Sequence, residues 1–194
     1  MSVPDWVEIA NKLVTPAIAA LSALYVYLQY RRAQRWKAGD LAMSLLGELQ
    51  RDPALALACQ SMDWGVGPLL IPEPYRAFFA KDGSGELPKV MQHDPAVLAR
   101  ALKPALDPAT LADPRGLVYR HCFIRLFEHL DDISRLLDTR QLAAEDLHAL
   151  RYWVRILHDY PYAPAGSAPD QTFMPALAGW GFIRVTQLHG KLGV

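Results

Sequence analysis

An apolar segment without charge near the N-terminus constrains the fold more than any other feature of the sequence. Residues 13–30 read LVTPAIAALSALYVYLQY and contain no Asp, Glu, Lys or Arg. As a helix, roughly 18 residues span about 27 Å, close to the hydrocarbon thickness of about 30 Å in a bilayer. The run therefore predicts a transmembrane anchor helix with the membrane-embedded positions Leu13, Pro16, Ile18, Leu21, Leu24, Val26 and Leu28.

The residues on either side of this run agree with a membrane position. Trp6 precedes it, Tyr30 ends it and Trp36 follows it, as expected of rings that prefer the headgroup region. The basic residues of the same flank are Arg31, Arg32, Arg35 and Lys37. By the positive-inside rule they predict a single-pass protein of the bacterial cytoplasmic (inner) membrane, with its N-terminus outside and its C-terminal domain in the cytoplasm.

Other interpretations of the segment remain open. A cleaved signal peptide carries its basic residues before the apolar run, whereas here they follow it. A buried core helix of a soluble protein is compatible with the shortness of the run. The segment also carries small residues that permit close approach of a second helix, namely Ala17, Ala20, Ser22 and Ala23.

Length and charge limit the rest of the chain. A chain of 194 residues accommodates one domain beside an anchor, so we expect an anchor region over 1–37 and a cytoplasmic domain over 38–194. Lys plus Arg equals Asp plus Glu at 20 each, which removes the overall positive field typical of nucleic-acid binding. No nucleic-acid partner is therefore expected.

Asp-Pro pairs and apolar periodicity predict a helical domain. The pairs that begin at residues 52 and 94 are typical of an N-cap followed by the first helical residue, and those that begin at 107 and 113 mark further turns or helix starts. Two further helices are expected over 115–137 and 144–158, and an apolar tail over 175–188 should close the core. Residues 65–93 and 161–170 form connectors rich in Pro and Gly, and no alternating strand pattern is evident. The predicted fold is all-α: a transmembrane helix followed by a small irregular helical bundle.

Several short motifs support a resemblance. They are Arg35-Trp36-Lys37, Asp52-Pro53, Asp63-Trp64, Arg125-Leu126-Phe127-Glu128, Glu145-Asp146-Leu147, Tyr152-Trp153 and Gly181-Phe182 with Val185 and Leu188. In this combination the chain resembles a family of uncharacterised bacterial proteins with one N-terminal transmembrane helix and a helical cytoplasmic domain. The resemblance implies a membrane-tethered helical domain and no assigned activity.

One group of polar residues is a candidate site. His121, Arg125, Glu128 and Asp132 share a stripe of the expected helix 115–137. Their spacing matches no known metal motif, so we predict no metal, cofactor or catalytic residue. The group fits a solvated face with surface ion pairs, or an Arg125–carboxylate pair that joins two helices.

These patterns lead to three hypotheses of function. The first is an interaction or scaffold protein at the inner face of the membrane, with the lipid bilayer and an unidentified protein as partners. The second is a membrane-bound enzyme or sensor with a site around Arg125 and Glu128. The third is an accessory subunit whose anchor helix contacts a larger membrane complex.

Overall fold

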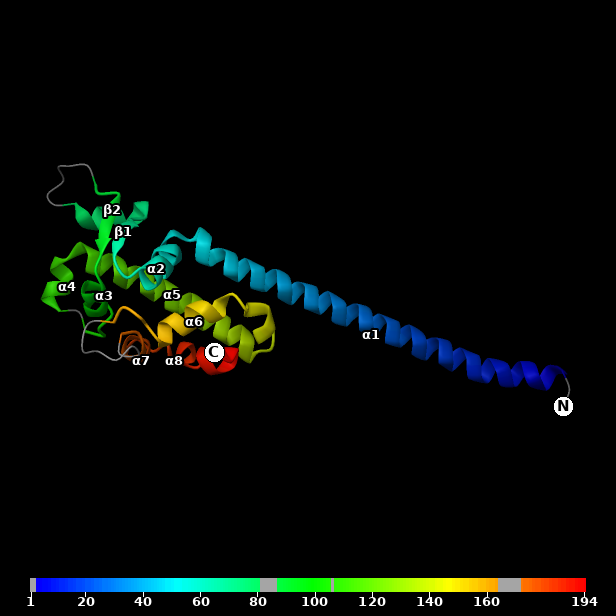
Figure 1. Cartoon of the computed structure of the whole chain (residues 1–194). Coiled ribbons are helices and arrows are strands. Elements are labelled where there is room, and N and C mark those ends of the chain that lie inside the picture. The colour runs from blue at the N-terminus through cyan, green and yellow to red at the C-terminus, as the bar shows by residue number, and fades with distance from the viewer. Residues whose placement is uncertain (1–2, 81–86, 106, 164–171) are drawn as a thin grey trace. The chain divides into compact units, whose positions relative to one another are not determined.

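The fold is taken from a computed structural model of the chain (Figure 1). It describes residues 3–80, 87–105, 107–163 and 172–194, and the backbone alone for residues 3–11 and 13. Most of the predicted loop 161–170 and the middle of the predicted connector 65–93 thus lie outside the described residues. The chain divides into two compact units, Met1–Leu41 and Ala42–Val194, each treated by itself below.

The first unit belongs to a single long helix, α1, which runs from Val3 to Arg51. Residues 31–51 therefore continue the N-terminal helix and do not fold back on it. Pro16 lies inside α1, where its ring removes one backbone hydrogen bond. Gly39, a weak point for a helix in the sequence, does not interrupt it.

The predicted transmembrane span is not supported by the structure. Among the described residues, no helix combines the length and apolar character needed to cross a membrane. The side chains of Trp6 and Leu13, which the sequence places at and near the outer end of the span, lie outside the described residues.

Four helices of the second unit start at the Asp-Pro pairs. In each case the aspartate is the N-cap and its carboxylate accepts a backbone N–H of the first turn, for example Ala54 N at 2.8 Å from Asp52 and Thr110 N at 2.6 Å from Asp107. The helices begun in this way are α2 (Pro53–Asp63), α3 (Pro95–Ala101), α4 (Pro108–Ala112) and α5 (Pro114–Asp138). The predicted starts of α2 and α3 are confirmed, and the pairs at 107 and 113, predicted as turns or helix starts, are helix starts.

Helix α5 is the centre of the core, and α2, α3, α4 and α8 (Ile183–Thr186) pack around it. The apolar stripe predicted for this helix is buried at Tyr119, Cys122, Phe123, Leu126, Phe127, Leu130 and Ile133, and its last member, Leu137, is half-buried. Phe123 stacks on Phe173, with ring centroids 5.3 Å apart, which brings the C-terminal part of the chain onto α5.

A small sheet corrects the all-helical prediction. Strand β1 (Gly67–Leu70) pairs with strand β2 (Val90–His93) in antiparallel register, with Leu69 opposite Met91. The prediction that no strand is present was wrong, because strands of four residues are too short to show a period of two. Between them lies a short helical segment, η1 (Glu73–Phe79).

The C-terminal third consists of short helices. The predicted helix 144–158 is broken into η2 (Ala144–Leu147) and α6 (Leu150–His158). Helices α7 (Met174–Gly179), α8 and α9 (Leu188–Leu192) follow. Leu177, Val185 and Leu188 are buried, so the tail closes the core as expected.

Candidate functional site

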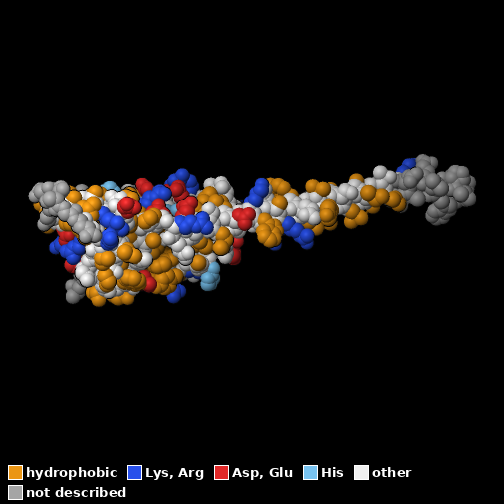
Figure 2. All heavy atoms as spheres, turned by 90° about the horizontal axis from the view of Figure 1, so that it is seen from above, with side chains coloured by type: hydrophobic (Ala, Val, Ile, Leu, Met, Phe, Trp, Pro, Cys, Tyr) orange, Lys and Arg blue, Asp and Glu red, His pale blue; other side chains and the backbone are white. Residues whose placement is uncertain are grey.

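The exposed apolar part of α1 is the most unusual surface of the molecule. The large apolar side chains from Val14 to Trp36 are 48 to 74% exposed. Figure 2 shows hydrophobic side chains along this helix, with basic side chains beside them. We call residues 14–30 the apolar segment and residues 31–37 the basic segment.

Two contacts order the end of the apolar segment. The Gln29 amide donates to the Tyr25 hydroxyl at 3.0 Å, and the Arg31 guanidinium lies 5.9 Å from the centre of the Tyr27 ring. The second contact is a cation–π interaction between the two segments. Arg32, Arg35, Trp36 and Lys37 are exposed. The helix thus passes from an uncharged to a cationic surface within one turn.

The predicted polar cluster on α5 is brought together only in part. Arg125 lies 3.3 Å from Asp52 and 3.8 Å from Glu128, so it joins α5 to the start of α2. The Arg125 side chain is 53% exposed, and solvent therefore weakens both pairs.

The other two members of the cluster have different neighbours. Asp132 pairs with Arg135 at 3.4 Å. His121 lies against the Phe78 ring of η1, with ring centroids 5.3 Å apart, and next to Tyr75. All four predicted residues are exposed, and they do not converge on one point that a substrate could occupy.

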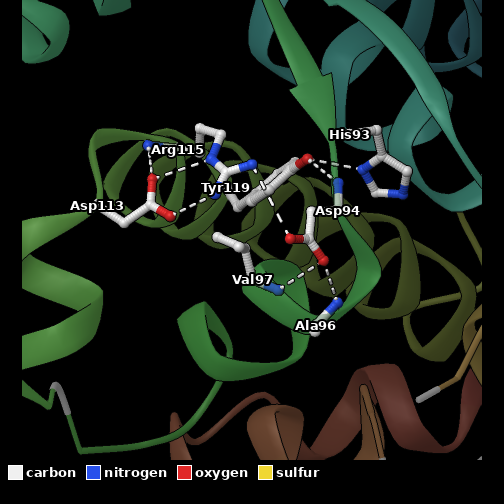
Figure 3. Close-up of polar contacts among 7 residues, drawn as sticks. All are labelled: His93, Asp94, Ala96, Val97, Asp113, Arg115 and Tyr119. Carbon is white, nitrogen blue, oxygen red and sulfur yellow. Dashed lines mark hydrogen bonds and ion pairs between the residues drawn. The ribbon is translucent and has the colours of Figure 1, made fainter. Parts of the chain in front are cut away.

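A buried network that the sequence did not suggest lies at the other end of α5 (Figure 3). Nδ1 of His93, at the end of β2, lies 2.6 Å from the Tyr119 hydroxyl. The backbone N–H of Asp94 donates to the same hydroxyl oxygen at 3.4 Å, so the hydroxyl proton is free to bond Nδ1. This arrangement favours the neutral ring with its proton on Nε2. Burial also favours the neutral ring, because it lowers the pKa of His93, while the Asp94 carboxylate opposes this shift.

Arg115 closes the network on its outer side. It contacts the Asp113 carboxylate through Nη2 at 2.8 Å and Nε at 3.1 Å, and it lies 3.9 Å from Asp94. The hydrogen bond from Arg115 lowers the pKa of Asp113. Both aspartates are also N-caps, so one set of contacts fixes the starts of α3 and α5. The only sequence signal for this network was the pair of Asp-Pro motifs at residues 94 and 113.

An exposed group of aromatic residues lies where α2 ends. The Tyr152 hydroxyl of α6 bonds the Asp63 carboxylate, and Gly65 lies so close to the Tyr162 ring that a Cβ at this position would be 2.5 Å from it. Trp64 and Val66, on either side of Gly65, are exposed. We call Trp64, Val66, Tyr152 and Tyr162 the aromatic patch. Exposed Trp and Tyr are typical of protein-binding surfaces.

The chemistry of the described residues is limited. Within the parts of the chain that the structure describes, no group of three or more His, Cys, Asp or Glu side chains is placed to hold a metal ion. Cys59 and Cys122 are buried free thiols, and burial raises the pKa of Cys59 to about 12. Such thiols are poor nucleophiles at neutral pH.

Comparison with known proteins gives no relative. No protein-family model, no curated protein and no solved structure matches the chain.

Proposed function

We propose that this chain is a membrane-tethered interaction protein: the apolar segment of α1 inserts into lipid, and the domain of residues 42–194 binds a protein partner at the inner face of the cytoplasmic membrane. The proposal concerns insertion into the lipid phase and does not require that α1 crosses the bilayer. The observation that carries it is the exposure of the apolar segment directly before the basic segment.

The distribution of side chains around the helix supports lipid as the occupant. Tyr30 and Val26 project from the side of the helix opposite Leu21 and Leu28, so large apolar side chains lie on opposite sides of the apolar segment, and its polar residues Thr15, Ser22 and Gln29 share one narrow stripe. A helix with apolar side chains on opposite sides buries all of them only in a protein core or in lipid. A single partner helix would leave half of these side chains in water, at a cost of about 1 kcal/mol each.

The basic segment supports an anionic membrane surface. Arg31, Arg32, Arg35 and Lys37 are followed by a single acidic residue, Asp40, before the second unit begins. Each basic residue near an anionic leaflet contributes about 1 kcal/mol. Four basic residues follow the apolar segment and one, Lys12, precedes it, and this excess supports an orientation with the domain on the cytoplasmic side.

Vesicle flotation tests the lipid part of the proposal. The full chain should float with vesicles that contain anionic phospholipid, and the double variant Leu21→Glu/Leu24→Glu should remain in solution. Met43→Glu is the matched control, since Met43 is an exposed apolar residue of the same helix outside the apolar segment. Flotation of the double variant at the wild-type level would contradict lipid insertion.

The aromatic patch supports the interaction part. Tyr152 and Tyr162 combine exposed rings with contacts that hold them in place, a combination that favours protein binding because little side-chain entropy is lost, and Trp64 adds a further exposed ring. A partner that purifies stoichiometrically with the full chain from membranes should be lost in Trp64→Ala and kept in Phe78→Ala, an exposed aromatic control in η1. Equal loss in both variants would contradict a role for the patch.

A second candidate is a subunit whose α1 packs on another helix. It is favoured by a stripe with alternate spacings of four and three, formed by Val14, Ile18, Leu21, Tyr25 and Leu28. In this case the partner is lost in Leu21→Glu/Leu24→Glu, and the wild-type chain does not float with protein-free vesicles.

A further inference from the structure

His129 of α5 is buried between α5 and the last turns of α1, with 5% of its side chain exposed. Its Nε2 lies 3.0 Å from the Leu45 carbonyl oxygen, and its Nδ1 lies 3.3 Å from a carboxylate oxygen of Glu48. Leu45 and Glu48 both belong to the second unit, so this contact is internal to the domain.

Both ring nitrogens of His129 therefore face acceptors. A backbone carbonyl and a carboxylate accept hydrogen bonds and have no proton to give. A neutral imidazole carries one proton and can satisfy only one of them, whereas an imidazolium donates to both. This is the opposite of His93, whose Nδ1 receives the hydroxyl proton of Tyr119.

We propose that His129 joins α5 to residues 42–51 of α1 through a contact whose strength depends on pH. When the ring is protonated, it binds the Leu45 carbonyl and the Glu48 carboxylate together. When the ring is neutral, its remaining proton stays on Nε2 for the Leu45 carbonyl, and the lone pair of Nδ1 repels Glu48. Glu48 is 49% exposed and can then turn toward water.

Glu48 is the charged group that responds to the protonation of His129, because neighbouring charged residues have other partners. Arg125, one turn before His129, is held by Asp52 at the start of α2, and Asp132, one turn after it, is held by Arg135. Arg51, one turn after Glu48, lies along Gly47. The charged groups of the elements packed here are Glu48 and Arg51 of α1, Asp52 of the α2 N-cap, and Arg125, Glu128 and Asp132 of α5.

The consequence is a pH-dependent hold on residues 42–51. The Glu48 carboxylate binds the ring only when both ring nitrogens carry protons. The ion pair thus adds to the attachment of residues 42–51 at lower pH. Because Glu48 is half exposed, its effect on local opening should be about threefold.

Amide hydrogen exchange of the full chain tests the pH dependence of the His129–Glu48 contact. After correction for intrinsic rates, amides of residues 42–51 should be protected about threefold more at about pH 5.5 than at about pH 7.5. Glu48→Gln, which keeps the size of the side chain but removes its charge, should abolish this difference. His148→Gln, a change at an exposed histidine, should preserve it.

Ring nitrogen chemical shifts of His129 provide a second readout that does not depend on a variant. They should report protons on both nitrogens at about pH 5.5 and on Nε2 alone at about pH 7.5. Equal exchange ratios in the wild type and Glu48→Gln, or an Nδ1 without a proton at the lower pH, would overturn the proposal.

Discussion

The Tyr119 hydroxyl of α5 lies 2.6 Å from Nδ1 of His93 at the end of β2, with both side chains buried. This bond ties the small sheet to the central helix, and the Asp94 N–H that reaches the same oxygen adds the start of α3 to the contact. One hydroxyl therefore connects α5 to the junction of β2 and α3, which lies 25 to 26 residues earlier in the sequence.

Tyr119→Phe should lower the free energy of unfolding by about 1–3 kcal/mol, because it leaves a buried imidazole nitrogen without its donor. Urea denaturation measures the change. The control is Tyr152→Phe, where the lost bond to Asp63 lies in an exposed position, and the expected change is below about 1 kcal/mol. An equal effect of both variants would mean that burial of the His93–Tyr119 bond adds nothing.

The stability of the domain should depend on pH through His93. Burial lowers the pKa of His93 in the folded chain, so below about pH 6.5 the unfolded chain binds more protons than the folded one. The contribution of His93 to stability is therefore complete above that pH and is lost as the pH falls through the folded pKa. Urea unfolding between about pH 5 and 7.5 should show a smaller pH slope in His93→Gln than in the control His148→Gln. Parallel slopes would contradict the neutral buried ring.

Asp52 should matter more as a helix cap than as a partner of Arg125. Its carboxylate accepts Ala54 N at 2.8 Å and Leu55 N at 3.3 Å, in addition to the exposed ion pair. Asp52→Ala should cost about 1 kcal/mol of unfolding free energy, whereas Asp52→Asn, which keeps the cap, and Arg125→Ala should each cost a few tenths. A loss of 1 kcal/mol or more in Arg125→Ala, measured by thermal unfolding, would give the ion pair the larger role.

Two glycines with opposite surroundings form a matched pair. A Cβ at Gly179 would lie 2.4 Å from Cγ of Pro104, while a Cβ at Gly190 meets nothing within 4 Å. Gly179→Ala should destabilise the domain by about 1–3 kcal/mol through overpacking. Gly190→Ala, in α9, should be neutral or stabilising by up to about 1 kcal/mol. Calorimetric unfolding of the two variants compares them directly.

Local signals explain which parts of the fold could be predicted. The Asp-Pro starts and the apolar face of α5 depend on neighbours within one or two helical turns, and both are visible in the sequence. The β1–β2 pairing depends on residues 20 to 26 positions apart, and four-residue strands carry no clear period. The break between η2 and α6 likewise lacks a Gly or Pro to mark it.

The candidate site was predictable to the same extent. The sequence placed Arg125 and Glu128 on one face of α5, and they lie together there. It could not reveal that Asp52 is the main partner of Arg125, since this contact joins residues of different helices. The His93–Tyr119 bond and the two acceptors of His129 were out of reach for the same reason.

The repeated use of Asp-Pro to begin α2, α3, α4 and α5 also has a consequence for how this sequence can diverge. Each start is encoded in two adjacent residues and requires no particular core partner. Core side chains can therefore be exchanged, and the loops before each pair lengthened, without changing the residue at which the following helix starts. Among descendants of this chain, the positions of the four pairs should be retained longer than the identity of the residues packed between them.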